Sequence, residues 1–139
     1  VPILRAGFGM LDGLLELVPS ARVGVIGLYR DPVTAKPVEY YCKLPGVENR
    51  DFILIDPMLA TGSSLVLAYN ALCEKGGTPK YTHVAAVIAS EQGIDYVSKN
   101  MPRQATTIWA AAVDEELTSR SYIVPGIGDA GDLAYGEKI

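Results

Sequence analysis

One stretch of the chain, residues 52–64, has the residue types and the order that a sugar-phosphate site requires. Four apolar residues, 52–55, predict the end of a strand that is buried on both faces, and Asp56 follows them directly. Small and hydroxylated residues at 60–64 then lead into an apolar, helix-like segment, 65–75. Because the free N–H groups and the positive dipole end of a helix attract phosphate, this order of strand, acid, small loop and helix predicts a cradle for a phosphate and its sugar.

Two other interpretations of residues 60–64 fit less well. Thr61, Ser63 and Ser64 could be N-caps of the helix, but capping explains one of these three hydroxyls and not the others. A nucleoside-triphosphate loop needs Lys before its Ser or Thr, and here Ser63 precedes Ser64. The triphosphate loop is therefore rejected.

Length, charge and cysteine content restrict the class of protein. The 139 residues fit one domain, 1–139, which can bury roughly two-thirds of its unfolded surface. A net charge of −4 argues against a nucleic-acid partner, and no apolar stretch has the length of a membrane span. Cys42 and Cys73 lie far apart without metal-ligand spacing, which favours a reducing compartment. We expect a soluble, cytoplasmic protein with a small-molecule partner and no membrane association.

The first four residues also suggest how the chain begins. Residues 1–4 are apolar, with no Met and no polar lead-in, so the chain is expected to begin inside a buried strand and to lack an N-terminal section.

Two arginines follow other predicted strands. Arg5 lies between the strand at 1–4 and a helical pattern at 8–18, and Arg30 lies between the strand at 23–29 and a polar, proline-containing loop. Neither arginine has an evident structural partner, and each could be an ordinary solvated loop residue. A planar guanidinium also suits two-point binding of phosphate, which is the functional alternative.

The remaining pattern predicts the fold class. Further strands are expected at 38–44, 81–90 and 108–113, with a helix at 91–100 and a solvated acidic turn at 114–116. His83 is the one histidine, and its place at the start of an apolar strand favours a structural role. Alternating strands and helices predict an α/β domain with a mainly parallel sheet flanked by helices. Sites in such sheets lie beyond the carboxyl ends of the strands.

Residues 121–132 are a second informative stretch. Three glycines and a proline within 125–131 argue against regular structure, although the neighbouring residues are apolar. Such a loop presents its backbone N–H and C=O groups to a ligand, unless it is only a tight surface turn.

Both stretches resemble one enzyme family. The run Asp56-Pro-Met-Leu-Ala-Thr-Gly-Ser-Ser64 is similar to the phosphoribosyl-diphosphate (PRPP) motif of type I phosphoribosyltransferases, in the Asp-Pro form of the uracil phosphoribosyltransferases. Residues 122–132 resemble the uracil-binding loop of that branch, and the Ile-Leu-Arg-Ala-Gly run at 3–7 resembles its pyrophosphate loop. Ser63, in place of a usual Gly, and residues 133–137 depart from the family pattern.

The resemblance implies a pentosyltransferase that converts uracil and PRPP to uridine monophosphate (UMP) and diphosphate in pyrimidine salvage. It implies Mg²⁺ as cofactor, held mainly through the substrate rather than by metal ligands of the protein. The implied catalytic residues are Asp56, Asp129 and Arg30. The implied PRPP-binding residues are Arg5, Arg30, Asp56, Pro57, Met58, Leu59, Ala60, Thr61, Gly62, Ser63, Ser64 and Asp129. The implied uracil-binding residues are Ile123, Gly128, Asp129 and Ala130.

The family also suggests a homodimer or homotetramer for the full-length protein, and GTP as an activator in some members. Two alternatives stay open from the residues. One is a non-catalytic, regulatory relative, such as an RNA-binding attenuator or a domain attached to a uridine kinase, although the acidic balance argues against RNA. The other is an enzyme for a different base, for which the 121–132 loop is the discriminating feature.

Overall fold

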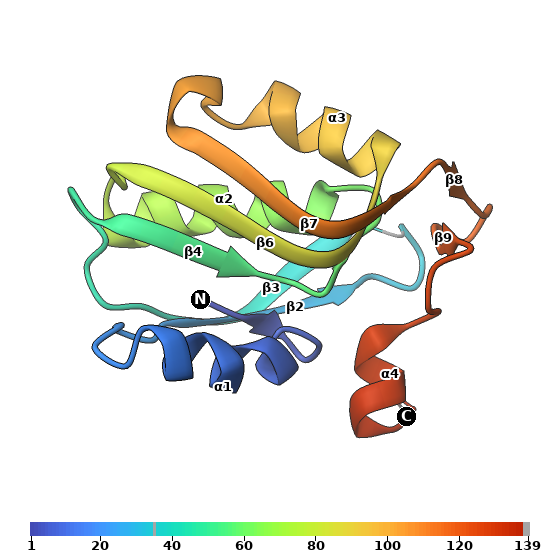
Figure 1. Ribbon diagram of the computed structural model, residues 1–139, viewed down its shortest axis with the longest axis horizontal. Coiled ribbons are helices and arrows are strands. Elements are labelled where there is room, and N and C mark those ends of the chain that lie inside the picture. Colours follow the sequence, from blue (N-terminus) through green and yellow to red (C-terminus); the bar gives the residue numbers. More distant parts are fainter. Residues whose placement is uncertain (35, 138–139) are drawn as a thin grey trace.

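The computed structural model describes residues 1–34 and 36–137 (Figure 1). Its elements follow the predicted order, with helices where the sequence has 3.6-residue periodicity and strands where apolar runs occur. The helices are α1 (Phe8–Leu17), α2 (Ser63–Gly76), α3 (Glu91–Asn100) and α4 (Ala130–Tyr135), with a short 3-10 helix at Arg103–Ala105. The strands are β1 (Ile3–Leu4), β2 (Val25–Arg30), β3 (Pro37–Lys43), β4 (Asp51–Ile55), β5 (Met58–Leu59), β6 (Tyr81–Ser90), β7 (Thr106–Asp114), β8 (Glu116–Leu117) and β9 (Ile123–Val124).

The main sheet is mostly parallel, as predicted. β1 runs parallel to β2, and β6 runs parallel to β4, β5 and β7. An isolated parallel bridge between Pro2 and Ile55 joins these two groups of strands. β3 lies antiparallel beside β2, and β8 and β9 form a small antiparallel pair beyond the end of β7. The α/β fold class is therefore confirmed.

The hydrophobic core lies between the sheet and the helices α2 and α3. Leu54 of β4 and Val84 of β6 are fully buried there. They join Leu65 and Leu72 of α2 and Val97 of α3 in one cluster. α2 ends at Gly76, and its C-cap Gly77 has a φ of 92°, which glycine accommodates readily.

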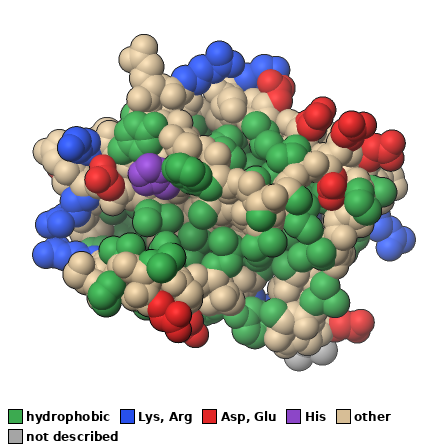
Figure 2. All heavy atoms as spheres, viewed as in Figure 1, with side chains coloured by type: hydrophobic (Ala, Val, Ile, Leu, Met, Phe, Trp, Pro, Cys, Tyr) green, Lys and Arg blue, Asp and Glu red, His purple; other side chains and the backbone are tan. Residues whose placement is uncertain are grey.

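The other face of β6 and β7 is open and faces the viewer in Figures 1 and 2. Figure 2 shows hydrophobic side chains spread across this face. Trp109 of β7 is 59% exposed, and its Nε1 donates to Nδ1 of His83 at 3.2 Å. His83 also lies beside the ring of Tyr81. The single histidine thus has two aromatic neighbours, and its structural role stays a prediction.

A groove of about 600 Å³ lies between α1 and β4, where its lining includes the side chains Leu11, Leu14, Leu15, Val18, Phe52 and Ile53. All residues of α1 are described, and none of them is fully buried. Among the described residues, no helix combines the length and the apolar character that a membrane crossing needs.

The packing predicts that two leucine-to-alanine substitutions differ greatly in their effect on the free energy of unfolding. Leu54 is 0% exposed in the core, whereas Leu17 at the end of α1 is 81% exposed. Leu54→Ala is expected to lower the free energy of unfolding by about 2–5 kcal/mol, because it leaves a cavity. Leu17→Ala should change it by no more than about 0.5 kcal/mol. Urea denaturation of both variants is the measurement, and equal losses would contradict the proposed location of the core.

Candidate active site

The carboxyl ends of the parallel strands bring five polar residues to one edge of the sheet. Arg5 follows β1, Arg30 ends β2, and Asp56 follows β4. Ser90 ends β6 and lies in register with Asp114 at the end of β7. This edge is where ligands bind in open α/β sheets, so the sequence-predicted residues gather where a site is expected.

Asp56 lies in a break between two strands that pair with the same neighbour. β4 and β5 both run parallel to β6, and residues 56 and 57 interrupt the ladder between them. The N–H of Asp56 donates to the carbonyl of Ala85 at 3.2 Å, and the carbonyl of Pro57 accepts from two successive N–H groups of β6. The break therefore displaces the acid from regular strand geometry without separating the strands.

Burial raises the pKa of Asp56 to about 7, because a desolvated carboxylate is disfavoured relative to its neutral form. The N–H of Met58, 3.3 Å from Oδ1, opposes this rise, and the nearby charge of Asp129 adds to it. Part of Asp56 stays accessible. Two carboxyl groups from distant parts of the sequence are thus close enough to interact, and a cation or a hydroxyl donor here would favour the charged form of Asp56.

The loop before α2 leaves the start of that helix open. Gly62 is the N-cap, with a φ of 78°, and it has no side chain with which to cap the helix. Thr61 Oγ1 bonds Ser63 Oγ at 2.9 Å and also accepts from the N–H of Ser63 at 3.5 Å. One hydroxyl therefore contacts the helix start, as the capping alternative allowed, and its long bond leaves that N–H available to a stronger acceptor. A Cβ at Gly62 would lie 2.9 Å from the carbonyl oxygen of Gly93, so the position also requires a glycine for space.

Ser90 fixes this loop, and the sequence analysis missed it. Its Oγ donates to the carbonyl of Ala60 at 2.5 Å and accepts from the N–H of Gly93 at 2.9 Å, which caps α3. A serine directly before a predicted helix is a capping signal. That signal does not reveal the second bond, which joins the loop to α3.

Met58 and Leu59 form β5, and Pro57 lies in the break just before it, so none of the three belongs to the open loop. Pro57 is buried, and Leu59 is 1% exposed in the core. These two side chains cannot reach a ligand, so any contact they make with PRPP must come through the backbone.

The glycine-rich stretch has more regular structure than predicted. Ile123 is buried in β9, which pairs with β8, and α4 begins at Ala130. The expectation of an irregular 121–132 stretch is wrong at both ends. Between them, Gly126 and Gly128 have φ values of 48° and 81°, which glycine accommodates readily. No other described atom lies within 4 Å of the position that a Cβ of Gly128 would occupy, so this position borders open space.

Asp114 holds the glycine-rich stretch in place. Its Oδ2 accepts from the N–H of Gly126 at 3.0 Å. The predicted solvated turn at 114–116 is therefore wrong, because Asp114 is partly buried and Glu116 begins β8. The sequence offers no local signal for a bond between residues so far apart.

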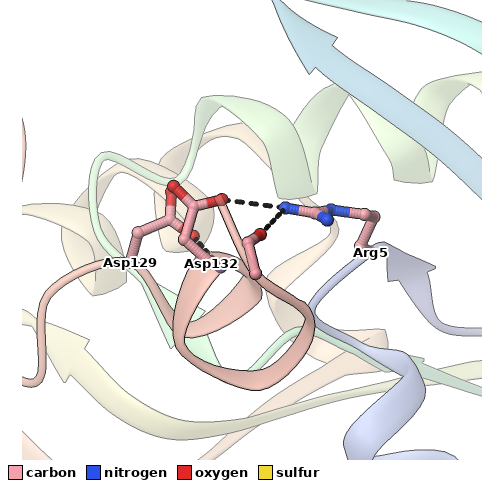
Figure 3. Close-up of polar contacts among 4 residues, drawn as sticks. Arg5, Asp129 and Asp132 are labelled. Atoms are coloured by element: carbon pink, nitrogen blue, oxygen red, sulfur yellow. Dashed lines mark hydrogen bonds and ion pairs between the residues drawn. The ribbon is translucent and has the colours of Figure 1, made fainter. Parts of the chain in front are cut away.

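Asp129 caps α4, and its side chain accepts from the N–H of Asp132 at 2.9 Å. Asp132 in turn binds Arg5, whose Nη2 lies 2.8 Å from Asp132 Oδ1 and 2.9 Å from the carbonyl oxygen of Gly136 (Figure 3). The expectation that Arg5 lacks a structural partner is wrong. Arg5 and Asp129, predicted from separate motifs, are joined through Asp132.

Arg30 lies farther out along the same edge. Leu4 is beside Gly27 in the β1–β2 ladder, and Arg30 is exposed at the end of β2, opposite Pro37. The predicted loop after Arg30 connects two antiparallel strands, and Asp31 accepts from the N–H groups of residues 33 and 34 there. Residue 35 of this predicted loop lies outside the described residues.

Within residues 1–34 and 36–137, no group of three or more His, Cys, Asp and Glu side chains could hold a metal ion. Asp56 and Asp129 nevertheless supply two interacting carboxyl groups. Mg²⁺ commonly takes one or two carboxylates and completes its shell with substrate oxygens and water, so these residues fit an ion that arrives with a diphosphate.

Comparison with known proteins identifies the family of this chain. The family model for uracil phosphoribosyltransferase matches residues 1–137. The chain belongs to the uracil phosphoribosyltransferase family. It is 55% identical to a uracil phosphoribosyltransferase of Bacillus licheniformis and 56% identical to one of a Geobacillus species (strain WCH70). Each alignment covers 99% of this chain and 65% of the relative, so the chain spans somewhat less than two-thirds of their length.

Solved structures support the family assignment and the fold. The AQ2163 protein of Aquifex aeolicus superposes with a TM-score of 0.91 at 35% identity, over 99% of this chain and 64% of that one. A purine phosphoribosyltransferase of Pyrococcus horikoshii superposes with a TM-score of 0.58 at 14% identity, over 84% of this chain and 76% of that one. The second similarity concerns the fold alone, which is that of a phosphoribosyltransferase.

The raised pKa of Asp56 predicts a pH-dependent stability. Between about pH 4 and pH 7 the folded state keeps a proton that the unfolded state has lost, so stability falls as pH rises through this window. Asp56→Asn removes this dependence and should be more stable than the parent by roughly 1–3 kcal/mol at pH 8, with little difference at pH 4. Urea denaturation across this range is the measurement. Asp51→Asn, at the exposed start of β4, is the control. An unchanged slope in Asp56→Asn would contradict the raised pKa.

Proposed function

We propose that the chain carries the site of a uracil phosphoribosyltransferase, which converts uracil and PRPP to UMP and diphosphate in pyrimidine salvage. One observation supports this most directly. Asp56, in the break between β4 and β5, precedes the start of α2 in the sequence and interacts with Asp129 of the glycine-rich stretch. A phosphate-binding helix end, a sugar-binding acid and a base-reading loop are the parts that this reaction needs.

The PRPP half of the site is assigned to two motifs. The N–H groups of residues 61–64 bind the 5-phosphate, because a helix start combines unpaired donors with a favourable dipole. Asp56 accepts from the ribose hydroxyls, and Asp129 contributes from the opposite side. Arg5 and Arg30 bind the diphosphate, for which a guanidinium offers two parallel donors.

The base half is assigned to the backbone of residues 123–130. Uracil has two carbonyl acceptors on either side of one N–H donor, which backbone N–H and C=O groups can match. Gly128 borders open space, and the contacts of Asp114 and Asp129 fix the two ends of this backbone. Cytosine reverses part of the pattern and would leave buried groups unpaired, which costs a factor of about 10⁴ or more.

Catalysis follows from position and charge. Uracil loses its N1 proton to solvent and N1 bonds the anomeric carbon, while the bond from that carbon to diphosphate breaks and its electron pair leaves on diphosphate. The ribose gains positive character as this bond breaks. The carboxyl groups of Asp56 and Asp129 stabilise that charge, while Arg5 and Arg30 stabilise the departing diphosphate. Bound Mg²⁺ would supply further neutralisation of the diphosphate charge.

Further properties are proposed from family resemblance. They are Mg²⁺ dependence, assembly of the full-length protein as a homodimer or homotetramer, a cytoplasmic location and activation by GTP. The described residues show no membrane-crossing helix and free Cys42 and Cys73, which agrees with this location.

The base-reading assignment predicts the effect of a side chain at Gly128. Gly128→Val should abolish UMP formation, because it fills the open space and opposes the φ of 81°. PRPP affinity should stay within about twofold, since the phosphate loop is a separate segment. Gly128→Asn also adds a side chain, but asparagine tolerates a positive φ. Comparison of this variant with Gly128→Val therefore separates the loss of space from the backbone strain. Calorimetric titration with PRPP and uracil, beside an assay of UMP, is the measurement. Loss of both affinities would make the loop a general scaffold, and retained uracil binding would place the base elsewhere.

The diphosphate assignment predicts a different result for Arg30. Arg30→Ala should weaken PRPP binding about tenfold or more, because a charge-assisted contact is lost. Arg22→Ala, an exposed arginine before the opposite end of β2, is the matched control and should leave PRPP affinity unchanged. If Arg30→Ala binds PRPP as the parent does, Arg30 is not a diphosphate ligand.

A further inference from the structure

Two hydrogen bonds of Arg5 occupy Nη2, the nitrogen that takes part in either mode of two-point phosphate binding. Nη2 donates both to Asp132 Oδ1 and to the carbonyl of Gly136. A guanidinium has two edges with parallel donors, Nε with Nη2 and Nη1 with Nη2, and Nη2 belongs to both. Because its two hydrogens are already used, a phosphate can engage either edge only by displacing Asp132 or Gly136.

These contacts also hold α4 against the turn between β1 and α1. Figure 1 shows α4 set apart from the main sheet. It approaches this turn at Ala6, which would lie 3.7 Å from a Cβ at Gly131, and the first turn of α1 at Gly9, where a Cβ would lie 3.6 Å from Tyr135 Oη. The Arg5 contacts add an ion pair between side chains that are 36% and 29% exposed. Releasing Arg5 therefore removes a polar attachment of α4.

Asp132 connects this attachment to the other end of the site. Its N–H donates to the side chain of Asp129, whose charge influences Asp56 (Figure 3). A shift of α4 at Asp132 would move the partner of Asp129, at the end of the proposed base-reading backbone. One residue is thus bonded to Arg5 through its side chain and to Asp129 through its backbone.

We propose that Asp132 is a positioning residue that couples diphosphate binding to the position of the base-reading loop. The inference rests on the proposed function, in which Arg5 binds the diphosphate of PRPP. Without PRPP, Asp132 and Gly136 hold Arg5 and fix α4. The diphosphate takes one edge of Arg5 and releases Asp132 from it, and α4 with Asp129 then adjusts to the base. The contact lowers diphosphate affinity and makes base binding depend on PRPP.

The first test measures affinity with inorganic pyrophosphate and Mg²⁺, a probe that has neither ribose nor base. Asp132→Ala removes the competing acceptor and should raise pyrophosphate affinity by about three- to tenfold, with a smaller rise for Asp132→Asn. Asp95→Asn, which removes the same charge from the exposed Asp95–Lys99 pair of α3, is the matched control and should have no effect. Weaker or unchanged binding by Asp132→Ala would overturn the proposal, because it would show that Asp132 does not compete for Arg5.

The deciding measurement of the second test is made on the parent protein, so it does not depend on a variant that could misfold. Saturating pyrophosphate should speed hydrogen exchange at the amides of α4 in the parent protein, because Arg5 no longer holds the helix. In Asp132→Ala these amides should already exchange faster than in the parent before pyrophosphate is added, and their exchange rates should change little when it is added. Unchanged or slower exchange at α4 in the parent, with pyrophosphate bound, overturns the coupling and leaves the proposed function intact. A parent protein that binds neither pyrophosphate nor PRPP overturns both.

Discussion

The site depends on a carboxyl group that is held where its charge is disfavoured. Asp56 occupies a break in the sheet, and burial raises its pKa to about 7. Pro57 suits the break, because it has no N–H to leave unpaired there while its carbonyl still accepts from β6. The strand then resumes as β5 and leads to the phosphate loop, which Ser90 fixes through Ala60. The position of the acid and the position of the helix start are consequences of one local interruption.

Acceptor groups dominate the opposite side of the site. The carboxylates of Asp114 and Asp129 accept from backbone N–H groups, and that of Asp132 accepts from Arg5. Bonds between charged acceptors and N–H donors are stronger than neutral ones, so three acids fix a stretch that has little side-chain packing. The same acids make the surroundings unfavourable for a diphosphate.

The sequence predicted the fold well, because apolar runs and helical periodicity depend on local residue types. The bounds of β6 and α3 agree with the predicted 81–90 and 91–100. Arg5, Arg30 and Asp56, each predicted to follow a strand, lie at the carboxyl ends of β1, β2 and β4. The contacts of Arg5, Ser90 and Asp114 were not predictable, since each joins segments that are distant in sequence and carries no periodic signal. The irregular appearance of 121–132 was misleading for a different reason. Its glycines and proline argued against regular structure, although Asp129 is a local N-cap signal whose side chain accepts from the N–H of Asp132.

The outer edge of β7 affects how the chain behaves in a concentrated solution. In the described part of the chain β7 pairs with β6 alone, and its other row of N–H and C=O groups borders solvent next to the exposed Trp109. Natural edge strands are commonly protected by Lys, Pro or a bulge, and the residues from Thr106 to Val113 contain no charge and no proline. Any other extended segment can therefore add to this sheet without meeting electrostatic repulsion. We therefore expect intermolecular pairing along this strand to be a route by which the chain aggregates in a crowded or heated solution.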